Sequence, residues 1–315
     1  MAYQITFLQL EALVAIADMG SFEAAGRKLG SVQSGVSRHV RELESQFPRP
    51  LFDRVARSAR LTVDGLEVLS QARTILQQRD VLLSQYASEK VLRRSLRLGM
   101  TELAALTWLP GFIDALRSAY PLVDVELEVG GVAADLYEKL RLAQLDLAIL
   151  PDTPRWTDML RFPLATVRNG WYCSPAFKLK GRRLAVSELG QLTLLSQAAD
   201  SAAGHAMSEW LERNGVQPRN IMTCNSFSAL GGMASAGLGV ACLPNAIAGE
   251  LVTLGRLREV HVTPVMPPVR YVAVARHDGL TPFHRRVVAL ARATCDYGTR
   301  YQDADARESL GNEDQ

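Results

Sequence analysis

A short run of polar and basic side chains, spaced to share one helix face, is the part of the sequence best suited to chemistry. The apolar residues around it recur at the spacing of a helix that packs one side on a small core: Val36, Val40, Leu43 and Phe47. A second face then carries hydroxyl and guanidinium groups: Ser34, Ser37, Arg38 and Arg41. Such groups bind phosphate oxygens and purine edges. This face therefore predicts contact with double-stranded DNA.

The segment before this helix predicts a partner helix and a tight turn. A helix is expected from Ser21, a suitable N-cap, with Glu23 favourably placed in its first turn, to an end near Leu29. Gln33 then starts the second helix, where a long amide could reach bases if the helix enters a groove by its N-terminal end. A third apolar stripe precedes both: Phe7, Leu10, Leu13, Val14 and Ala17. The alternative is an ordinary helical hairpin with a solvated charged face.

The local charge favours DNA over that alternative. Between Arg27 and Arg60 there are eight basic residues and three acidic ones, whereas the whole chain of 315 residues has a net charge of only +2. The positive field is therefore concentrated at the helix pair.

Residues 5 to 65 resemble the winged helix-turn-helix of LysR-type transcriptional regulators. The resemblance rests on GSFEAA at 20–25, LFDR at 51–54, LT at 61–62 and these single positions: Leu29, Gln33, Val36, Ser37, Arg38, Leu43, Glu44, Arg57 and Gly65. It implies DNA contacts from the second helix and from a wing that carries Arg54 and Arg57. Four positions depart from the family pattern, namely Gly26 and Gly35 in place of alanine, Val32 in place of serine and Ser34 in place of proline. The last two leave the helix cap open, with Ser31 as the nearest substitute.

Composition sets the remaining limits. A length of 315 residues is enough for two or three compact units, and a hydrophobic content of 48% allows each to have a core. No apolar run approaches the roughly 20 residues needed to span a bilayer. The N-terminus lacks a leader pattern, so a cytoplasmic protein is expected, without a membrane partner. The cysteines form no CxxC pair and have no histidine nearby at metal-ligand spacing: Cys173, Cys224, Cys242 and Cys295. We therefore expect them to pack in the core, and we expect no metal site and no cofactor.

A long helix is expected from Asp64 to Val91, with Thr62 as its N-cap. Its apolar residues approximate a seven-residue repeat: Leu66, Leu69, Ala72, Leu76, Leu83 and Tyr86. Exposed alone, this stripe would face water, so self-association into a homodimer or homotetramer is expected. In the resembled family such a linker pairs two subunits. The alternative is that the helix packs on its own C-terminal domain.

Strands and helices alternate after residue 93, which predicts parallel sheet covered by helices on both faces. The expected strands are 95–101, 123–129, 145–150, 170–174, 192–196, 221–224, 240–243 and 269–276, and the expected helices are 105–119, 133–142, 202–214, 227–235 and 282–295. The fold class is thus α and α/β: a winged helix-turn-helix (1–63), a linker helix (64–92) and a two-lobed domain (93–298). Lobe I spans about 93–166 and 268–298, lobe II about 167–267, and 299–315 reads as a disordered tail. By resemblance the two-lobed domain binds an effector and is similar in fold to periplasmic solute-binding proteins.

Turns between strands and helices supply the candidate effector contacts. Thr101 and Glu102 follow the first strand of lobe I, where a hydroxyl and free backbone N–H groups suit an anion. The corresponding positions of lobe II are Ser196, Gln197 and Ser201, with Phe227 as an apolar surface. A small polar effector carrying a carboxylate is expected to close the lobes around Thr101 and Ser196.

Two other functional classes remain as alternatives. One is an enzyme and the other a protein that only captures a small molecule, either with a structural N-terminal domain. The five histidines are dispersed and no nucleophile, phosphate-loop or dinucleotide motif occurs, so no catalytic residue is expected. The sequence favours a ligand-responsive regulator that binds promoter sites with dyad symmetry and works with RNA polymerase.

Overall fold

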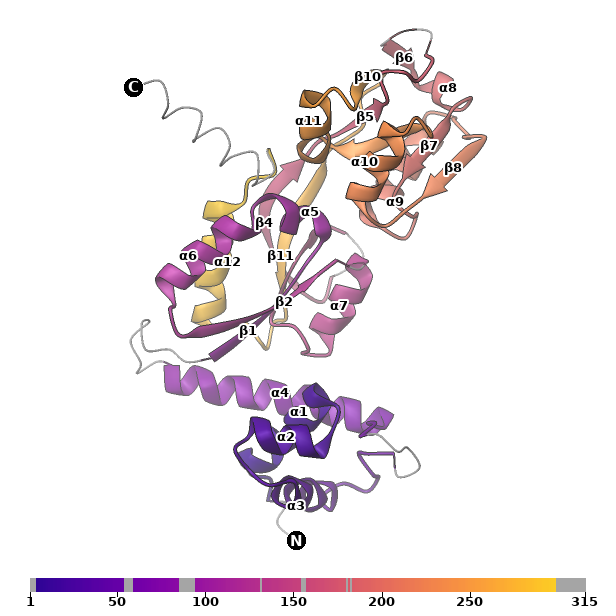
Figure 1. The fold of residues 1–315 in the computed structure, drawn as a ribbon. Helices are drawn as coiled ribbons and strands as arrows, with labels where there is room; N and C mark the ends of the chain where they lie inside the picture. The colour runs from indigo at the N-terminus through magenta and orange to yellow at the C-terminus, as the bar shows by residue number, and fades with distance from the viewer. Residues whose placement is uncertain are drawn as a thin grey trace, which may run out of the picture. The chain divides into compact units, whose positions relative to one another are not determined.

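The computed structural model describes residues 4–53, 59–84, 94–130, 132–153, 157–179, 181 and 183–298. The chain divides into two compact units. One comprises Met1–Leu92 with Lys139–Leu145, and the other comprises Arg93–Glu138 with Asp146–Gln315 (Figure 1). Within the described residues no helix is both long and apolar enough to cross a membrane.

The first unit is built from helices around one small core. Its helices are α1 (Phe7–Met19), α2 (Phe22–Lys28), α3 (Gln33–Glu44) and α4 (Val63–Ser84). Ser21 caps α2 by accepting a hydrogen bond from the Ala24 amide at 3.2 Å, as the sequence predicts. The predicted apolar face of α3 is confirmed for Val36, Val40 and Leu43, which are buried in this core. Phe47 lies beyond the end of α3 and packs, partly buried, against the same core.

The start of α3 differs from the expectation. Val32, rather than Ser31, is the N-cap, and no side chain accepts a hydrogen bond from the first turn. The amide of Ser31 instead donates to the carbonyl of Gly26 at 2.9 Å, which closes the turn between α2 and α3. The first amides of α3 therefore lack a side-chain acceptor from their own cap.

A short antiparallel bridge between Phe52 and Leu61 forms the base of the wing. The carboxylate of Glu44, at the end of α3, accepts hydrogen bonds from the Leu51 amide at 2.7 Å and the Phe52 amide at 3.2 Å. This contact fixes the wing base to the end of α3. Arg54 and Arg57 lie outside the described residues.

Helix α4 begins where the sequence predicts, since Thr62 accepts a hydrogen bond from the Gly65 amide at 3.0 Å. The predicted stripe, however, divides between two faces. Leu69 and Ala72 are 3% and 1% exposed and belong to the core of this unit, whereas Leu66 is 40% exposed. Part of the predicted stripe is therefore buried within this unit and is not available for pairing with another chain. Residues 85–91, including Tyr86, and the side chain of Leu83 lie outside the described set.

Two ion pairs hold α4 to α1. Arg73 is 7% exposed at its side chain and contacts Asp18 at 2.5 Å, and Arg79 contacts Glu11 at 2.5 Å. The Arg79 guanidinium also lies 5.3 Å from the ring centroid of Phe7. Together with the shared core, these contacts make α4 part of the first unit over its described length.

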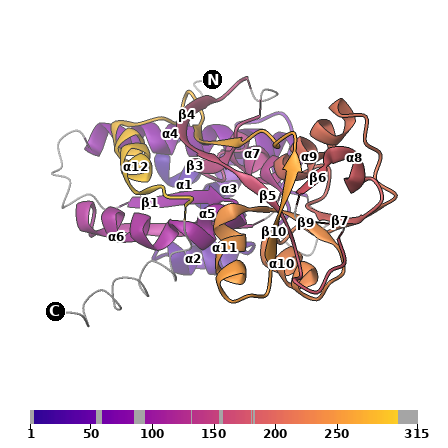
Figure 2. The same ribbon diagram turned by 90° about the horizontal axis from the view of Figure 1, so that it is seen from above.

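The second unit begins with a lobe built on a five-stranded sheet, ordered β2-β1-β3-β11-β4. Its strands are β1 (Arg94–Met100), β2 (Val123–Val129), β3 (Leu147–Pro151), β4 (Leu160–Val167) and β11 (Val269–Ala275). Its helices are α5 (Glu102–Thr107), α6 (Leu109–Ala119), α7 (Ala133–Arg141) and α12 (Pro282–Thr294), with α7 counted in the first unit from Lys139 onward. Helices α6 and α12 lie together on one face of the sheet, and α7 lies on the other (Figures 1 and 2).

The second lobe is built on a six-stranded sheet, ordered β6-β10-β5-β9-β7-β8. Its strands are β5 (Asn169–Cys173), β6 (Arg183–Ala185), β7 (Thr193–Ser196), β8 (Asn220–Thr223), β9 (Val240–Pro244) and β10 (Arg258–Thr263). Its helices are α8 (Val186–Leu189), α9 (Ala202–Arg213), α10 (Phe227–Ser235) and α11 (Asn245–Thr253). Its core includes Trp171 and Trp210, whose ring centroids are 5.9 Å apart.

The chain passes between the lobes twice, from β4 to β5 and from β10 to β11. Because of these passages, each sheet contains both parallel and antiparallel strand pairs, whereas parallel sheet was expected. Strand β11 runs antiparallel to β3 and β4, and β5 runs antiparallel to β9 and β10. The expected helix 105–119 is also two helices, α5 and α6, which break at Trp108 ahead of a proline in the first turn of α6.

Candidate functional site

Helix α3 presents its predicted polar face to solvent. The side chains of Gln33, Ser34, Arg38 and Arg41 are exposed, and Ser37 is half-buried. Val32, just before them, is 70% exposed and adds an apolar group at the N-terminal end of the helix. Hydroxyl, amide and guanidinium groups beside one apolar side chain are the groups that read phosphates, purine edges and thymine methyls.

The charge on this face is less uniform than the sequence suggests. Arg38 lies 3.8 Å from the carboxylate of Glu42, one turn further along α3. Glu42 also accepts a hydrogen bond from the Gln9 side chain at 3.2 Å and lies 3.8 Å from the ring of His39. The row of Ser34, Ser37, Arg38 and Arg41 contains no acidic residue, but Arg38 has the Glu42 carboxylate beside it on the same helix.

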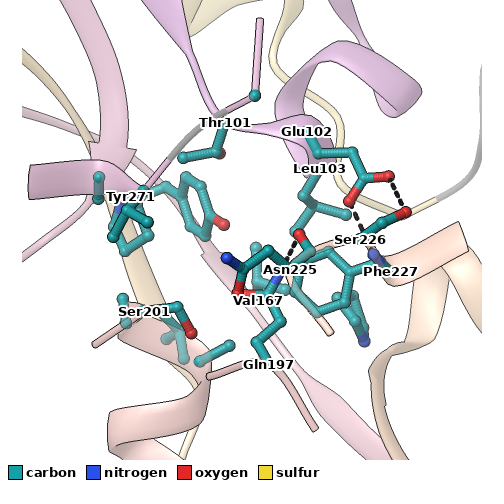
Figure 3. A pocket seen from close by; sticks show the side chains of 18 of the residues that line it. Thr101, Glu102, Leu103, Val167, Gln197, Ser201, Asn225, Ser226, Phe227 and Tyr271 are labelled. Atoms are coloured by element: carbon teal, nitrogen blue, oxygen red, sulfur yellow. Dashed lines mark hydrogen bonds between the residues drawn. The ribbon is translucent and has the colours of Figure 1, made fainter. Parts of the chain in front are cut away.

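The second unit contains a cavity of about 510 Å³ between its two lobes (Figure 3). This volume lies within the range of small-molecule sites. Apolar walls come from both lobes and from the crossing segments: Leu103, Val129, Val132, Ala133, Pro151, Val167, Phe227, Pro244 and Val269. Polar groups are interspersed among them: Thr101, Glu102, Asn169, Gln197, Ser201, Asn225, Ser226 and Tyr271.

Five of the six residues predicted to contact an effector line this cavity. They are Thr101, Glu102, Gln197, Ser201 and Phe227. Ser196 does not, because it is the last residue of β7 and only 2% exposed, with its carbonyl accepting from the Cys224 amide. The turn after β7 brings Gln197 to the cavity in its place.

Several of these polar groups already have partners within the protein. Ser201 caps α9, since its hydroxyl accepts from the Gly204 amide at 3.0 Å and donates to the Ala198 carbonyl at 2.8 Å. The Gln197 amide donates to the Asn225 carbonyl at 3.2 Å. Both residues are thus held in fixed positions at the cavity wall.

Glu102 makes the most distinctive contact in the cavity. It is the first residue of α5 in the first lobe, yet its carboxylate accepts two hydrogen bonds from the start of α10 in the second lobe. The donors are the Ser226 hydroxyl at 2.9 Å and the Phe227 amide at 2.7 Å, drawn as dashed lines in Figure 3. The free backbone N–H groups and the dipole of a helix start favour this negative charge.

Two chemically distinct residues of the cavity, Tyr271 and Cys224, were not predicted from the sequence. Tyr271, from the middle of β11, is 5% exposed, and burial raises the pKa of its phenol to about 12, so it remains a hydrogen-bond donor at neutral pH. Cys224 lines the cavity and is half-buried, contrary to the expectation of core packing. It follows β8, a sheet-edge strand whose four residues are all exposed. The described residues contain no cluster of three side chains able to hold a metal ion.

Comparison with protein families identifies both units. Residues 7–66 match the bacterial regulatory helix-turn-helix of the lysR family, and residues 89–296 match the LysR substrate binding domain. The chain belongs to the LysR family of bacterial transcriptional regulators. The fold predicted from the sequence, a helix-turn-helix followed by a two-lobed α/β domain, is confirmed.

Individual relatives resemble this LysR-family chain over most of its length. It is 27% identical to the regulator CbbR of Cereibacter sphaeroides over 275 residues, covering 85% of this chain and 87% of CbbR. It is 25% identical to CzcR of Bacillus anthracis over 248 residues, covering 79% and 83%.

Among solved structures, full-length OxyR from Pseudomonas aeruginosa, in a cysteine variant, has a TM-score of 0.76 at 21% identity and covers 94% of this chain and 97% of OxyR. LysG from Corynebacterium glutamicum, solved with bound effector Arg, has a TM-score of 0.62 at 19% identity and covers 92% and 97%.

Proposed function

We propose that this LysR-family regulator binds dyad-symmetric promoter DNA through α3 and the wing, and that a small polar molecule held between its lobes controls transcription. The observation that carries the proposal is the pairing of an exposed polar helix face in one unit with a partly polar cavity of about 510 Å³ in the other. The protein is proposed to act in the cytoplasm together with RNA polymerase.

On the DNA side, Gln33 and Ser34 are the proposed base contacts because they occupy the exposed N-terminal end of α3. Ser37, Arg38 and Arg41 extend this face along the helix toward phosphates. Arg54 and Arg57 remain proposed wing contacts on the strength of the sequence pattern alone.

On the effector side, the proposed contacts are Thr101, Gln197, Ser201 and Tyr271, with Phe227 as the apolar wall. Because these residues come from both lobes, a ligand that touches them all gains its full binding energy only when the lobes are close together. The effector bound by LysG in its solved structure supports a small polar molecule of comparable size here.

Self-association is proposed through surfaces that each unit leaves apolar. On α4, Val63, Ile75 and Leu82 are 76%, 46% and 60% exposed, and on the edge strand β2 Leu127 is 42% exposed. Exposed apolar groups on a helix face or a sheet edge favour pairing with another chain. We propose a homodimer as the minimal state, with a homotetramer as the form bound to an extended site.

The proposed function is tested by footprinting the purified protein on DNA that flanks its own gene. The expected result is protection of a site with dyad symmetry, at a protein concentration well below that needed for shuffled DNA of the same composition. Equal affinity for both DNAs would contradict a sequence-specific regulator and leave only general electrostatic binding.

A further inference from the structure

Glu102 differs from the other polar residues of the cavity because it brings a charge. It is the only charged side chain among the described residues that line the cavity, and the carboxylate lies at the start of α10. The α10 end of the cavity therefore already holds an anion supplied by the protein itself.

Both oxygens of this carboxylate are used. One accepts from the Ser226 hydroxyl and the other from the Phe227 amide, which leaves Ser226 to accept from the Ala229 amide at 3.2 Å as the cap of α10. Glu102 and its donors are 124 and 125 residues apart in sequence, so the contact ties two separately formed lobes. Charge-assisted hydrogen bonds of this kind are about twice as strong as neutral ones.

We propose that Glu102 is an internal anion that occupies the α10 end of the cavity, ties the two lobes together there, and excludes effectors that carry an anionic group at that end. This inference rests on the proposed function, because it narrows the effector of the same cavity. An incoming carboxylate or phosphate near Phe227 would meet a negative charge with no cation among the described lining residues to offset it. A carboxylate on the effector must therefore face another part of the cavity, and neutral or amino groups suit the α10 end.

The test removes the internal anion and asks whether a free anion takes its place. Inorganic phosphate is the probe, added to the full-length protein at constant ionic strength, and hydrogen exchange of the peptide amides at the start of α10 is the local readout. In Glu102→Ala we expect these amides to exchange about tenfold faster than in the wild type, and phosphate to slow them again by a comparable factor.

The matched control is Asp200→Ala, which makes the same change in net charge at an exposed residue outside the cavity lining. In this variant and in the wild type, phosphate should leave the exchange rate of the α10 amides unchanged. Any phosphate that binds the DNA-binding face does so equally in all of these proteins, so it cannot explain a response found only in Glu102→Ala. A phosphate response equal in wild type and Glu102→Ala, or absent from both, overturns the proposal.

Glu102→Gln keeps the side-chain shape and tests the tie if the alanine variant does not fold. Its neutral amide oxygen is a weaker acceptor, so exchange at Phe227 should rise about threefold to tenfold. An unchanged rate overturns the tie. DNA binding is measured on the same samples. If the wild type does not bind DNA, the proposed function fails; if the α10 amides show no exchange response, the proposal for Glu102 fails.

Discussion

At the residue scale, the two glycines that depart from the family pattern have different structural roles. A side chain at Gly26 would place its Cβ 2.9 Å from the Ser31 carbonyl oxygen and 3.3 Å from the Gln33 amide nitrogen, both of them backbone atoms. At Gly35 the only close atom is the Ser31 hydroxyl, also at 2.9 Å, which can rotate away. Gly26 therefore allows the close approach of α2 to the turn, whereas Gly35 is merely a poor helix former.

This difference predicts opposite effects of the same substitution. Gly35→Ala should raise the free energy of unfolding by roughly 0.5 to 1 kcal/mol, because alanine loses less backbone entropy in a helix. Gly26→Ala should lower it by about 1 to 3 kcal/mol, because the turn must shift. Urea titration of both variants against the wild type checks the sign, and equal stabilisation by both would show that the turn at Ser31 is looser than the structure indicates.

The cysteines show where residue patterns mislead. Cys242 lies in β9, is 7% exposed, and burial raises the pKa of its thiol to about 12, as an apolar strand predicts. Cys224 lies just beyond its strand, where the chain turns to the cavity, and polar residues follow it directly, Asn225 and Ser226. These polar neighbours are the sequence signal that could have separated Cys224 from Cys242, which lies between Ala241 and Leu243.

A labelling experiment follows from this contrast. At pH 8 the thiolate, which is the reactive form, is a negligible fraction of Cys242 in the folded protein. We expect iodoacetamide to modify Cys242 only after denaturation, and Cys224 in the native protein, as followed by mass spectrometry of peptides. The Cys224→Ser variant is the control for peptide assignment. Rapid native modification of Cys242 would contradict its burial.

At the element scale, most strands and helices that line the cavity could be predicted from the sequence, whereas some strands at the edges of the two sheets could not. Strands β1, β2 and β9 follow from runs of apolar or alternating residues, and α10 begins and ends as predicted. Strand β4 was missed because it contains Pro163, which a sheet tolerates at its edge position. Strand β6 and helix α8 were missed because they are only three and four residues long. Strand β10 was missed although its residues alternate between exposed and buried, and α11 was missed as well.

An ion pair between Arg97, in the middle of β1, and Asp146, just before β3, offers a test of how the first lobe is held together. Burial disfavours the charged form of Asp146, but the Arg97 guanidinium at 2.7 Å and the Arg97 amide at 2.8 Å outweigh it and hold the pKa of Asp146 below its usual value. A lowered folded-state pKa means that the stabilisation is present above the unfolded-state value, about 3.9, and is lost as pH falls below it.

Asp146→Asn should therefore lower the free energy of unfolding by about 3 kcal/mol at pH 7, since it removes the negative charge that the partly buried Arg97 guanidinium contacts. The difference from wild type should shrink as the pH approaches 3. The exposed pair of Arg213 and Glu209 supplies the control, because Glu209→Gln should cost under about 1 kcal/mol. A pH-independent loss in Asp146→Asn would indicate a packing effect in place of an electrostatic one.

At the scale of the whole molecule, self-association should depend on the apolar face that α4 keeps exposed. Ile75→Glu combined with Leu82→Glu should weaken the homodimer by at least about tenfold, because a charge would have to be buried in the interface. Leu254→Glu, at a 58% exposed leucine after α11, is the matched control and should leave the assembly unchanged. Light scattering at micromolar concentration distinguishes the outcomes, and a dimer that survives the double change would place the interface elsewhere.

The most direct test of the account compares Gln33→Ala and Arg41→Ala on the protected site and on shuffled DNA, across a range of salt concentrations. Gln33→Ala should cost roughly 1 to 3 kcal/mol on the protected site and little on shuffled DNA, because base contacts carry the specificity. Arg41→Ala should weaken both DNAs alike and reduce the salt slope by about one, because it neutralises a phosphate. If Gln33→Ala instead weakens binding to both DNAs equally, α3 does not read bases from its N-terminal end.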